Sequence, residues 1–102
     1  MIRVVVMLTA KPGRRDELVA AFQANAPTVR AEAGCIEYAA FVDATGLGPF
    51  QTKVGPDGCI ILEAWESPEA LNAHVVTPHM IAYGQRTKDL IASRVIHVVT
   101  AV

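Results

Sequence analysis

The sequence has little of what several large classes of protein require. Its 102 residues contain two cysteines, Cys35 and Cys59, which form no CxxC pair and are too few for a disulfide-stapled scaffold, so we expect buried, reduced thiols. No apolar run approaches the ~18 residues that a membrane span needs. Met1 leads directly into a strand pattern, without a charged and then apolar leader, so we expect a soluble, cytoplasmic protein.

An excess of charge of one sign is also lacking. The formal net charge is -1 and the isoelectric point is about 6.3, which leaves no basic field for nucleic acid or an anionic membrane. The sequence has no GxSxG, P-loop or GxGxxG pattern, so hydrolase and nucleotide-binding functions have no support. His74 and His79 do not have the i, i+4 spacing of two metal ligands on one helix face, and we expect no metal site.

Apolar side chains, in contrast, are abundant. They make up 52% of the residues, slightly above the usual share of about 45–50%, and we expect one domain over residues 1–102. The first predicted strand, residues 2–9, is apolar on both faces. One face carries Ile2, Val4, Val6 and Leu8, and the other carries Val5 and Met7. A strand of this kind is covered on both sides.

A helix is predicted over residues 14–31 by the change to helical spacing. Its apolar stripe consists of Leu18, Phe22, Ala26 and Val29. Pro27 lies inside this pattern, so we expect the helix to kink or restart near Asn25 and Ala26. Gly34 follows the helix and suits a left-handed backbone conformation at its end.

The remainder of the chain predicts three strands and two capped helices. The strands are expected at residues 35–43, 59–66 and 95–102. The connection 44–58 is rich in glycine and proline, and we expect it to shape any pocket. Ser67-Pro68-Glu69 and Thr77-Pro78 are each a capping residue followed by proline, which predicts one helix from residue 68 and another from residue 78 to about 92.

The order of elements is βαββαβ. This is the ferredoxin-like α+β arrangement, a four-stranded antiparallel sheet with helices on one face. The helices leave the second apolar side of the strands without a cover, and the sheet of another copy is the simplest one. We therefore expect a homodimer in the form of a dimeric α+β barrel.

Several short motifs, in order along nearly the whole chain, resemble the antibiotic biosynthesis monooxygenase family. They are Lys11-Pro12-Gly13, Gly34-Cys35, Glu63-x-Trp65-Glu66-Ser67, and His74 followed by Pro78-His79-Met80. The resemblance implies a dimeric ferredoxin-like protein with a pocket between sheet and helices in each subunit. Some members oxygenate phenols or quinols with molecular oxygen and neither metal nor flavin, whereas others degrade haem or isomerise small sugar-like molecules.

The site residues of two branches of the family carry over only in part. The tryptophan of the aromatic-polyketide oxygenases is present as Trp65, but the places of their asparagine, tyrosine and arginine hold Ile61, Leu71 and Gln85, with Arg86 adjacent. The positions expected for the haem-degrading branch hold Val6, His74 and Gly84, which disfavours haem degradation. Trp65, His74 and His79 are shared with the quinol-monooxygenase-like members.

His74 and His79 are the candidate catalytic residues, because imidazole can accept a phenolic proton near neutral pH. His74 is the stronger candidate, since it follows Leu71 by three positions and so shares its inward face. An alternative has His74 bonded to a backbone carbonyl and His79 facing water. For His97, in an apolar strand, we expect a buried structural role.

The candidate substrate-binding residues are Trp65, Glu63, Tyr83, Leu71 and Arg86. Trp65 is either core or a wall that stacks on a flat ring. Glu63 shares its face of the sheet and, if buried, needs a partner, for which we consider Arg3 or His97. Tyr83 lies four residues after His79, so its hydroxyl could share that face.

Two classes of function remain open. The first is a cofactor-independent monooxygenase that acts on a small aromatic quinol or phenol with molecular oxygen. The second is a dimeric, non-catalytic module that binds a small molecule, and an isomerase of the same fold is a further possibility. The identity of the substrate does not follow from the sequence.

Overall fold

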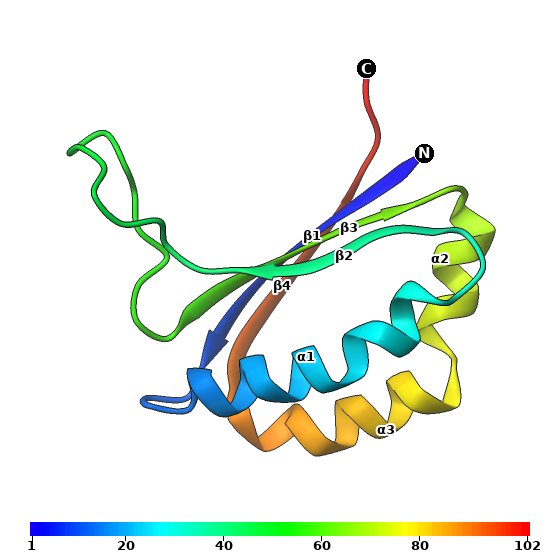
Figure 1. Ribbon diagram of the computed structural model, residues 1–102, viewed down its shortest axis with the longest axis horizontal. Helices are drawn as coiled ribbons and strands as arrows, with labels where there is room; N and C mark the ends of the chain where they lie inside the picture. Colours follow the sequence, from blue (N-terminus) through cyan, green and yellow to red (C-terminus); the bar gives the residue numbers. More distant parts are fainter.

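The chain forms an antiparallel sheet with helices on one face, in a computed structural model that covers residues 1–102 (Figure 1). The elements, in order, are β1 (Ile2–Ala10), α1 (Arg15–Arg30), β2 (Cys35–Phe41), β3 (Gly58–Trp65), α2 (Pro68–Val75), α3 (Pro78–Thr87), a short 3-10 turn η1 (Lys88–Leu90) and β4 (Ile91–Val99). The predicted βαββαβ order is confirmed, and so is the four-stranded antiparallel sheet.

The order of strands across the sheet is β2-β3-β1-β4, as a ferredoxin-like fold requires. In the register of the sheet, Val4 of β1 lies between Glu63 of β3 and Val98 of β4. Four residues further along, Leu8 lies between Cys59 and Arg94. Because residues paired across strands point to the same face, all six side chains face the helices.

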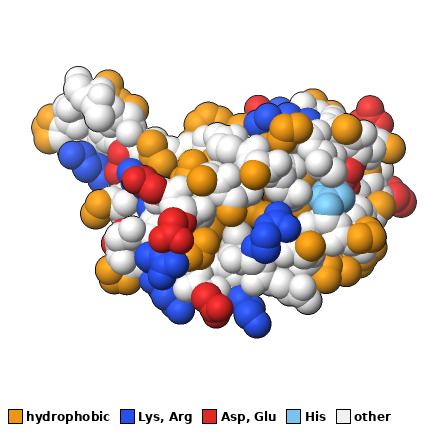
Figure 2. Space-filling view, turned by 60° about the horizontal axis from the view of Figure 1, so that its bottom comes forward, with side chains coloured by type: hydrophobic (Ala, Val, Ile, Leu, Met, Phe, Trp, Pro, Cys, Tyr) orange, Lys and Arg blue, Asp and Glu red, His pale blue; other side chains and the backbone are white.

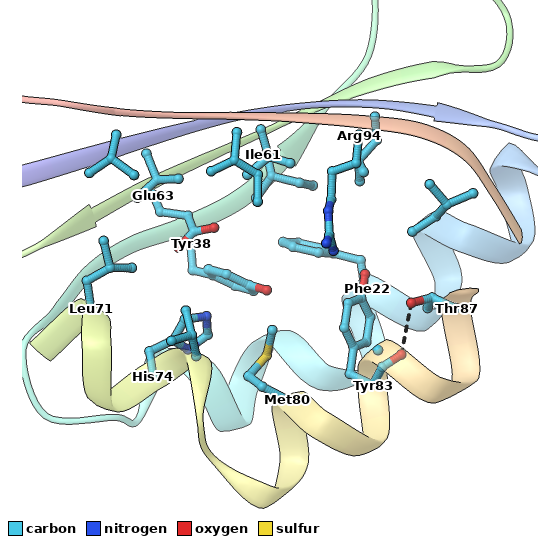
Figure 3. A pocket seen from close by; sticks show the side chains of 18 of the residues that line it. Phe22, Tyr38, Ile61, Glu63, Leu71, His74, Met80, Tyr83, Thr87 and Arg94 are labelled. Carbon is cyan, nitrogen blue, oxygen red and sulfur yellow. Dashed lines mark hydrogen bonds between the residues drawn. The ribbon is translucent and has the colours of Figure 1, made fainter. Parts of the chain in front are cut away.

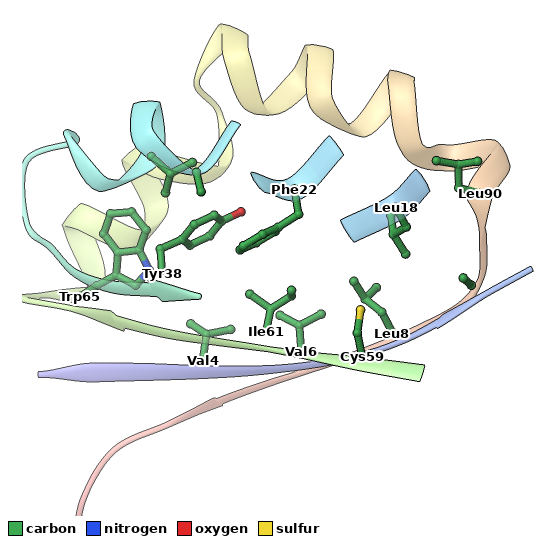
Figure 4. Packing of buried hydrophobic residues seen from close by; sticks show 13 residues of the cluster. Val4, Val6, Leu8, Leu18, Phe22, Tyr38, Cys59, Ile61, Trp65 and Leu90 are labelled. Atoms are coloured by element: carbon green, nitrogen blue, oxygen red, sulfur yellow. The ribbon is translucent and has the colours of Figure 1, made fainter. Parts of the chain in front are cut away.

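The core lies between this inner face of the sheet and α1 (Figure 4). The predicted helix stripe is confirmed, since Leu18, Phe22, Ala26 and Val29 are all at most 2% exposed. Each of the larger side chains stabilises the fold by about 1.5–3 kcal/mol through its removal from water. The helix continues through Pro27 as one element, so the predicted restart does not occur. Proline has no backbone N–H, so the helix loses one hydrogen bond, and this loss falls close to its C-terminal end.

The two helices after β3 begin at the residues that the capping motifs predicted, Pro68 and Pro78. Ser67 accepts a hydrogen bond from the backbone N–H of Ala70, and Thr77 accepts one from that of Met80. Thr77 also donates its hydroxyl proton to the carbonyl of His74 at 2.9 Å. This side chain therefore joins the end of α2 to the start of α3.

Several element boundaries differ from the sequence prediction. The helix α3 ends at Thr87 rather than near residue 92, and β4 starts at Ile91 rather than at residue 95. The cause is pairing with β1, because Ile91 lies opposite Ala10 and the N–H of Lys11 bonds to the carbonyl of Leu90. The strand β2 also ends two residues early, at Phe41, where its pairing with β3 stops.

The connection between β2 and β3 projects from one end of the sheet as a separate lobe (Figure 1). Its base is closed by Asp43, whose carboxylate accepts hydrogen bonds from the N–H groups of Val54 at 2.9 Å and Gly55 at 3.0 Å. These two bonds lower the pKa of Asp43 below its ordinary value. At neutral pH the carboxylate is therefore ionised and holds the lobe closed.

The outer face of the sheet, away from the helices, is apolar and uncovered. Met7, Phe41, Val95 and Val99 lie on it, and each is between 45% and 49% exposed. The helix side, by contrast, carries charges of both signs among apolar side chains (Figure 2). None of the helices combines the length and apolarity that crossing a lipid bilayer demands.

Gly34 lets α2 pack closely against the connection between α1 and β2. Its φ is +84°, and a Cβ at this position would lie 2.6 Å from the Cβ of Ala70. We predict that Gly34→Ala lowers the free energy of unfolding by at least about 2 kcal/mol, from left-handed strain and overpacking together. Chemical denaturation measures this change.

Gly13→Ala is the matched control, because Gly13 also has a positive φ, +77°, but has open space where the Cβ would be. It incurs only the backbone strain, about 1 kcal/mol. Equal losses of stability in the two variants would contradict the close packing of α2 against Gly34.

Candidate active site

A cavity of about 860 Å³ lies between the inner face of the sheet and the helices α2 and α3 (Figure 3). Of its 22 lining residues, 14 are hydrophobic, so a flat apolar ring can be bound there. The polar side chains that line it include Tyr38, Glu63, His74, Tyr83 and Arg94. They come from β2, β3, α2, α3 and β4, so the whole fold contributes to the site.

His74 has one ring nitrogen held by the protein and the other free. Its side chain is 3% exposed, and Nδ1 lies 2.9 Å from a carboxylate oxygen of Glu32. Nε2 of His74 has no hydrogen bond. It is not fully buried either, because Nδ1 of His79 is the one fully buried side-chain nitrogen or oxygen that lacks a partner. Nε2 of His74 is therefore accessible from the cavity that this residue lines. The alternative, a bond from His74 to a backbone carbonyl, is not what the structure contains.

Glu32 bridges the two histidines. The same carboxylate oxygen lies 2.9 Å from His74 Nδ1 and 3.2 Å from His79 Nε2. A carboxylate on Nδ1 fixes that nitrogen as the one that carries the proton, which leaves Nε2 as the acceptor. His79 does not line the cavity. The structure therefore brings both candidate histidines together but presents only His74 to the cavity.

Trp65 does not line the cavity, in contrast to the expectation that it forms a wall. The indole is 0% exposed within the core (Figure 4). Its ring centre lies 4.6 Å from that of His74. Its Nε1–H donates a hydrogen bond of 2.9 Å to Glu63. The indole thus packs behind the site, where it supports His74 and orients a carboxylate.

Glu63 finds its partner in Trp65 and not in Arg3 or His97. Arg3 and His97 belong to the outer face of the sheet, and Glu63 faces inward. For the same reason His97 is exposed rather than buried in the core. Burial raises the pKa of Glu63 above its ordinary value, against the hydrogen bond from Trp65 and the nearby His74. The neutral form of this carboxyl is therefore favoured in the fold.

Two tyrosines present unpaired hydroxyls to the cavity. Tyr38 stacks on Phe22 and meets the His74 ring edge-on, with ring centres 5.7 Å apart. Burial raises the pKa of Tyr38 well above its usual range and that of Tyr83 to about 12. Both hydroxyls remain protonated at neutral pH, so each can donate a hydrogen bond to a bound molecule.

The remaining predicted residues divide between the cavity and its surroundings. Leu71 lines the cavity beside His74, as its spacing predicted. Arg86 does not; its guanidinium carbon lies 6.0 Å from the centre of the Tyr83 ring. Residues 44–58 contribute nothing to the lining, so the expectation that this connection shapes the pocket is wrong. No group of three or more His, Cys, Asp or Glu side chains is arranged to hold a metal ion.

Sequence reasoning missed Glu32 and Arg94 as parts of this site. Glu32 lies between α1 and β2 and is 42 positions from His74. No periodicity connects residues so far apart. Arg94 points inward because it pairs with Leu8. This pairing could not be predicted, since the last strand was expected to start only at residue 95.

The comparisons with known proteins agree with this fold. A family model described as "Antibiotic biosynthesis monooxygenase" matches residues 1–86, and the chain belongs to this family. The protein named "Probable quinol monooxygenase YgiN" of Escherichia coli K12 is 38% identical over 90 residues, which cover 86% of each chain.

Two solved structures have the same fold. PA3566 from Pseudomonas aeruginosa superposes with a TM-score of 0.81 at 23% identity, over 99% of this chain and 93% of that one. Rv0793 from Mycobacterium tuberculosis superposes with a TM-score of 0.80 at 24% identity, over 99% and 94%. At these identities the likeness supports the fold alone.

The raised pKa of Glu63 predicts how stability depends on pH. Between the ordinary value of 4.5 and the raised pKa, the folded state binds more protons than the unfolded state, so this group makes stability fall as pH rises. Glu63→Gln keeps an oxygen to accept from Trp65 but removes the titration. We expect a higher melting temperature than wild type at pH 7 and little difference below pH ~4.5.

Glu69→Gln is a suitable control, because this exposed residue lies in the first turn of α2. It removes one carboxylate from the surface. The prediction about Glu63 is wrong if both variants show the same pH profile by thermal denaturation.

Proposed function

We propose that this protein is a monooxygenase that oxidises a hydroquinone or phenol with molecular oxygen, without a metal or flavin, and that His74 is its general base. The observation that carries the proposal is the free Nε2 of His74, which is accessible from a largely apolar cavity while Nδ1 is held by Glu32. Membership of the monooxygenase family and the likeness to a quinol monooxygenase support the choice of reaction.

The first step is removal of a phenolic proton. Oxygen reacts with the substrate only after the ring has become an electron-rich anion, and Nε2 of His74 accepts the proton that makes it so. The imidazolium that forms is stabilised by the Glu32 carboxylate, 2.9 Å from Nδ1. Because this carboxylate also contacts His79, it is oriented from two sides.

The second step is electron transfer to oxygen, and the atoms balance without a cofactor. The ring anion passes one electron to O₂, and the two radicals join through a new C–O bond to give a ring peroxide anion. The proton held by His74 converts this anion to a hydroperoxide. Cleavage of its O–O bond and of the C–H bond on the same ring carbon then releases water and leaves the other oxygen atom on the ring. A hydroquinone plus O₂ thus yields a hydroxyquinone plus water, and the substrate supplies all four electrons.

The walls of the cavity suit this chemistry in two ways. The protonated hydroxyls of Tyr38 and Tyr83 can donate hydrogen bonds to the oxygen atoms that become negative. The apolar lining favours a flat ring and limits the access of water to the anion. A non-catalytic binding module would not need an accessible imidazole nitrogen with a carboxylate behind it, which favours the enzyme.

The role of His74 can be tested by oxygen uptake with a panel of hydroquinones and phenols. We expect His74→Gln to lower kcat by about 100-fold or more, because a general base contributes at least this much to such a step. Wild-type protein that consumes no more oxygen than buffer with any member of the panel would refute oxygenation.

His97→Gln serves as the control for the loss of an imidazole, since His97 is exposed on the outer face of the sheet. Its oxygen uptake is expected to equal that of wild type. If His74→Gln is as active as His97→Gln, His74 is not the base.

We also propose that the active form is a homodimer in which two outer faces pack together. An apolar sheet face on which four large side chains are about half exposed is unusual for a monomer. Two of these residues, Met7 and Val95, are paired on adjacent strands and so form a continuous apolar surface. A two-fold interface would pair this face with itself and cover both copies at once. The cavity lies on the other side of the sheet and remains open to substrate.

The dimer can be tested by placing a charge on this face. Met7→Glu is expected to give the mass of one chain, 10.9 kDa, by light scattering at micromolar concentration, where wild type gives twice this mass. Val76→Glu is the control, because Val76 is 67% exposed at the end of α2, away from the outer face. A wild-type protein with the mass of a single chain would refute the dimer.

A further inference from the structure

Arg94 enters the cavity from the edge strand of the sheet. It lies on β4 opposite Leu8, whose side chain is 7% exposed in the core, so both side chains leave the inner face of the sheet. Figure 3 places its guanidinium between β4 and α3, pointing into the cavity toward Phe22 and Tyr83. This arginine is thus part of the lining.

The guanidinium of Arg94 has no partner within the chain. The ion pairs of this protein are Arg14 with Glu17 and Glu32 with the two histidines, and Arg94 makes neither an ion pair nor a hydrogen bond. Among the cavity-lining residues, Glu63 is the single carboxylate, and Lys88 of η1 adds a second cation to the lining. The end of the cavity near η1 and β4 is therefore positive in a protein whose net charge is -1.

The positive end and the His74 end are separated along the sheet. Glu63, which lies near His74 in the cavity lining, pairs with Val4, whereas Arg94 pairs with Leu8. Four residues of an extended strand span about 13 Å. After the reach of both side chains is subtracted, this separation suits one aromatic ring with a short substituent.

We propose that Arg94 binds a carboxylate on the substrate, so that the preferred substrates are phenols or hydroquinones that carry an acidic side chain. The inference rests on the proposed function for the phenolic end of the substrate, which His74 deprotonates. Arg94 then holds the opposite end through a pair of parallel N–H···O bonds, a geometry that suits guanidinium and carboxylate. The ring lies between these two ends, against the apolar wall.

An arginine at a surface often extends only to place its charge in water. Arg94 is itself exposed, but most side chains that line the cavity are apolar, so a ring bound there would displace water and leave the attraction between Arg94 and a carboxylate less screened. If Arg94 is only solvated, an acid and its neutral amide should bind with equal affinity. If Arg94 binds the carboxylate, the acid should bind more tightly than the amide.

The test is calorimetric titration with a hydroxyphenylpropanoic acid and with its primary amide, which has the same shape and no charge. We expect wild type to bind the acid at least about 10-fold more tightly than the amide. Arg94→Gln is expected to abolish this preference and leave the affinity for the amide unchanged. Addition of salt should weaken binding of the acid more than that of the amide.

Arg86→Gln is the matched control. Arg86 lies over the Tyr83 ring, and its charge, like that of Arg94, works to lower the pKa of the Tyr83 hydroxyl. Unlike Arg94, it does not line the cavity. This variant removes the same charge and should keep the preference for the acid. Equal affinities of wild type for acid and amide, or a preference that survives Arg94→Gln, would overturn the proposal.

Oxygen uptake separates this proposal from the proposed function. If the acid binds through Arg94 but no hydroquinone or phenol is oxidised, the reaction is wrong and the anion-binding site stands. If neutral hydroquinones are oxidised at equal rates by wild type and Arg94→Gln and the acid has no advantage, the reaction stands and the role of Arg94 is refuted.

Discussion

The bridge from Glu32 to His74 and His79 is the interaction on which the site depends. It connects the segment after α1 with the junction between α2 and α3, two parts of the chain that share no strand pairing. Glu32 is partly buried, and a carboxylate removed from water in this way between two imidazoles is stable only if all three groups are held in place. Thr77 holds the helix junction, and Gly34 allows α2 to approach the segment that carries Glu32. The backbone features and the side-chain chemistry therefore depend on each other.

The site also has a clear polarity. At one end the free nitrogen of His74 faces the cavity, with Trp65 packed behind it and Glu63, which bonds to Trp65, in the cavity lining. At the other end Arg94 supplies an unpaired positive charge. The apolar wall of the cavity comes mainly from β1, β4 and the helices, so recognition of a ring, removal of a proton and selection for charge involve different sets of elements.

The sequence predicted the fold well and the site only in part, for physical reasons. The stripe of α1 and the caps at Ser67 and Thr77 are local patterns, and the structure confirms them. The start of β4 was predicted late, because it depends on pairing with a strand 80 residues earlier in the chain. Trp65 was recognised but placed on the wrong side of the site, because period-two alternation gives the face of the sheet and not what covers it. Glu32 left no local signal.

The lobe between β2 and β3 has a consequence for how the protein can vary. Asp43 closes the lobe at its base, and no residue of the lobe reaches the cavity. The chain can therefore be lengthened or replaced between residues 44 and 53 with little effect on the pocket. The same segment is a natural place to graft a reporter peptide or a fluorophore.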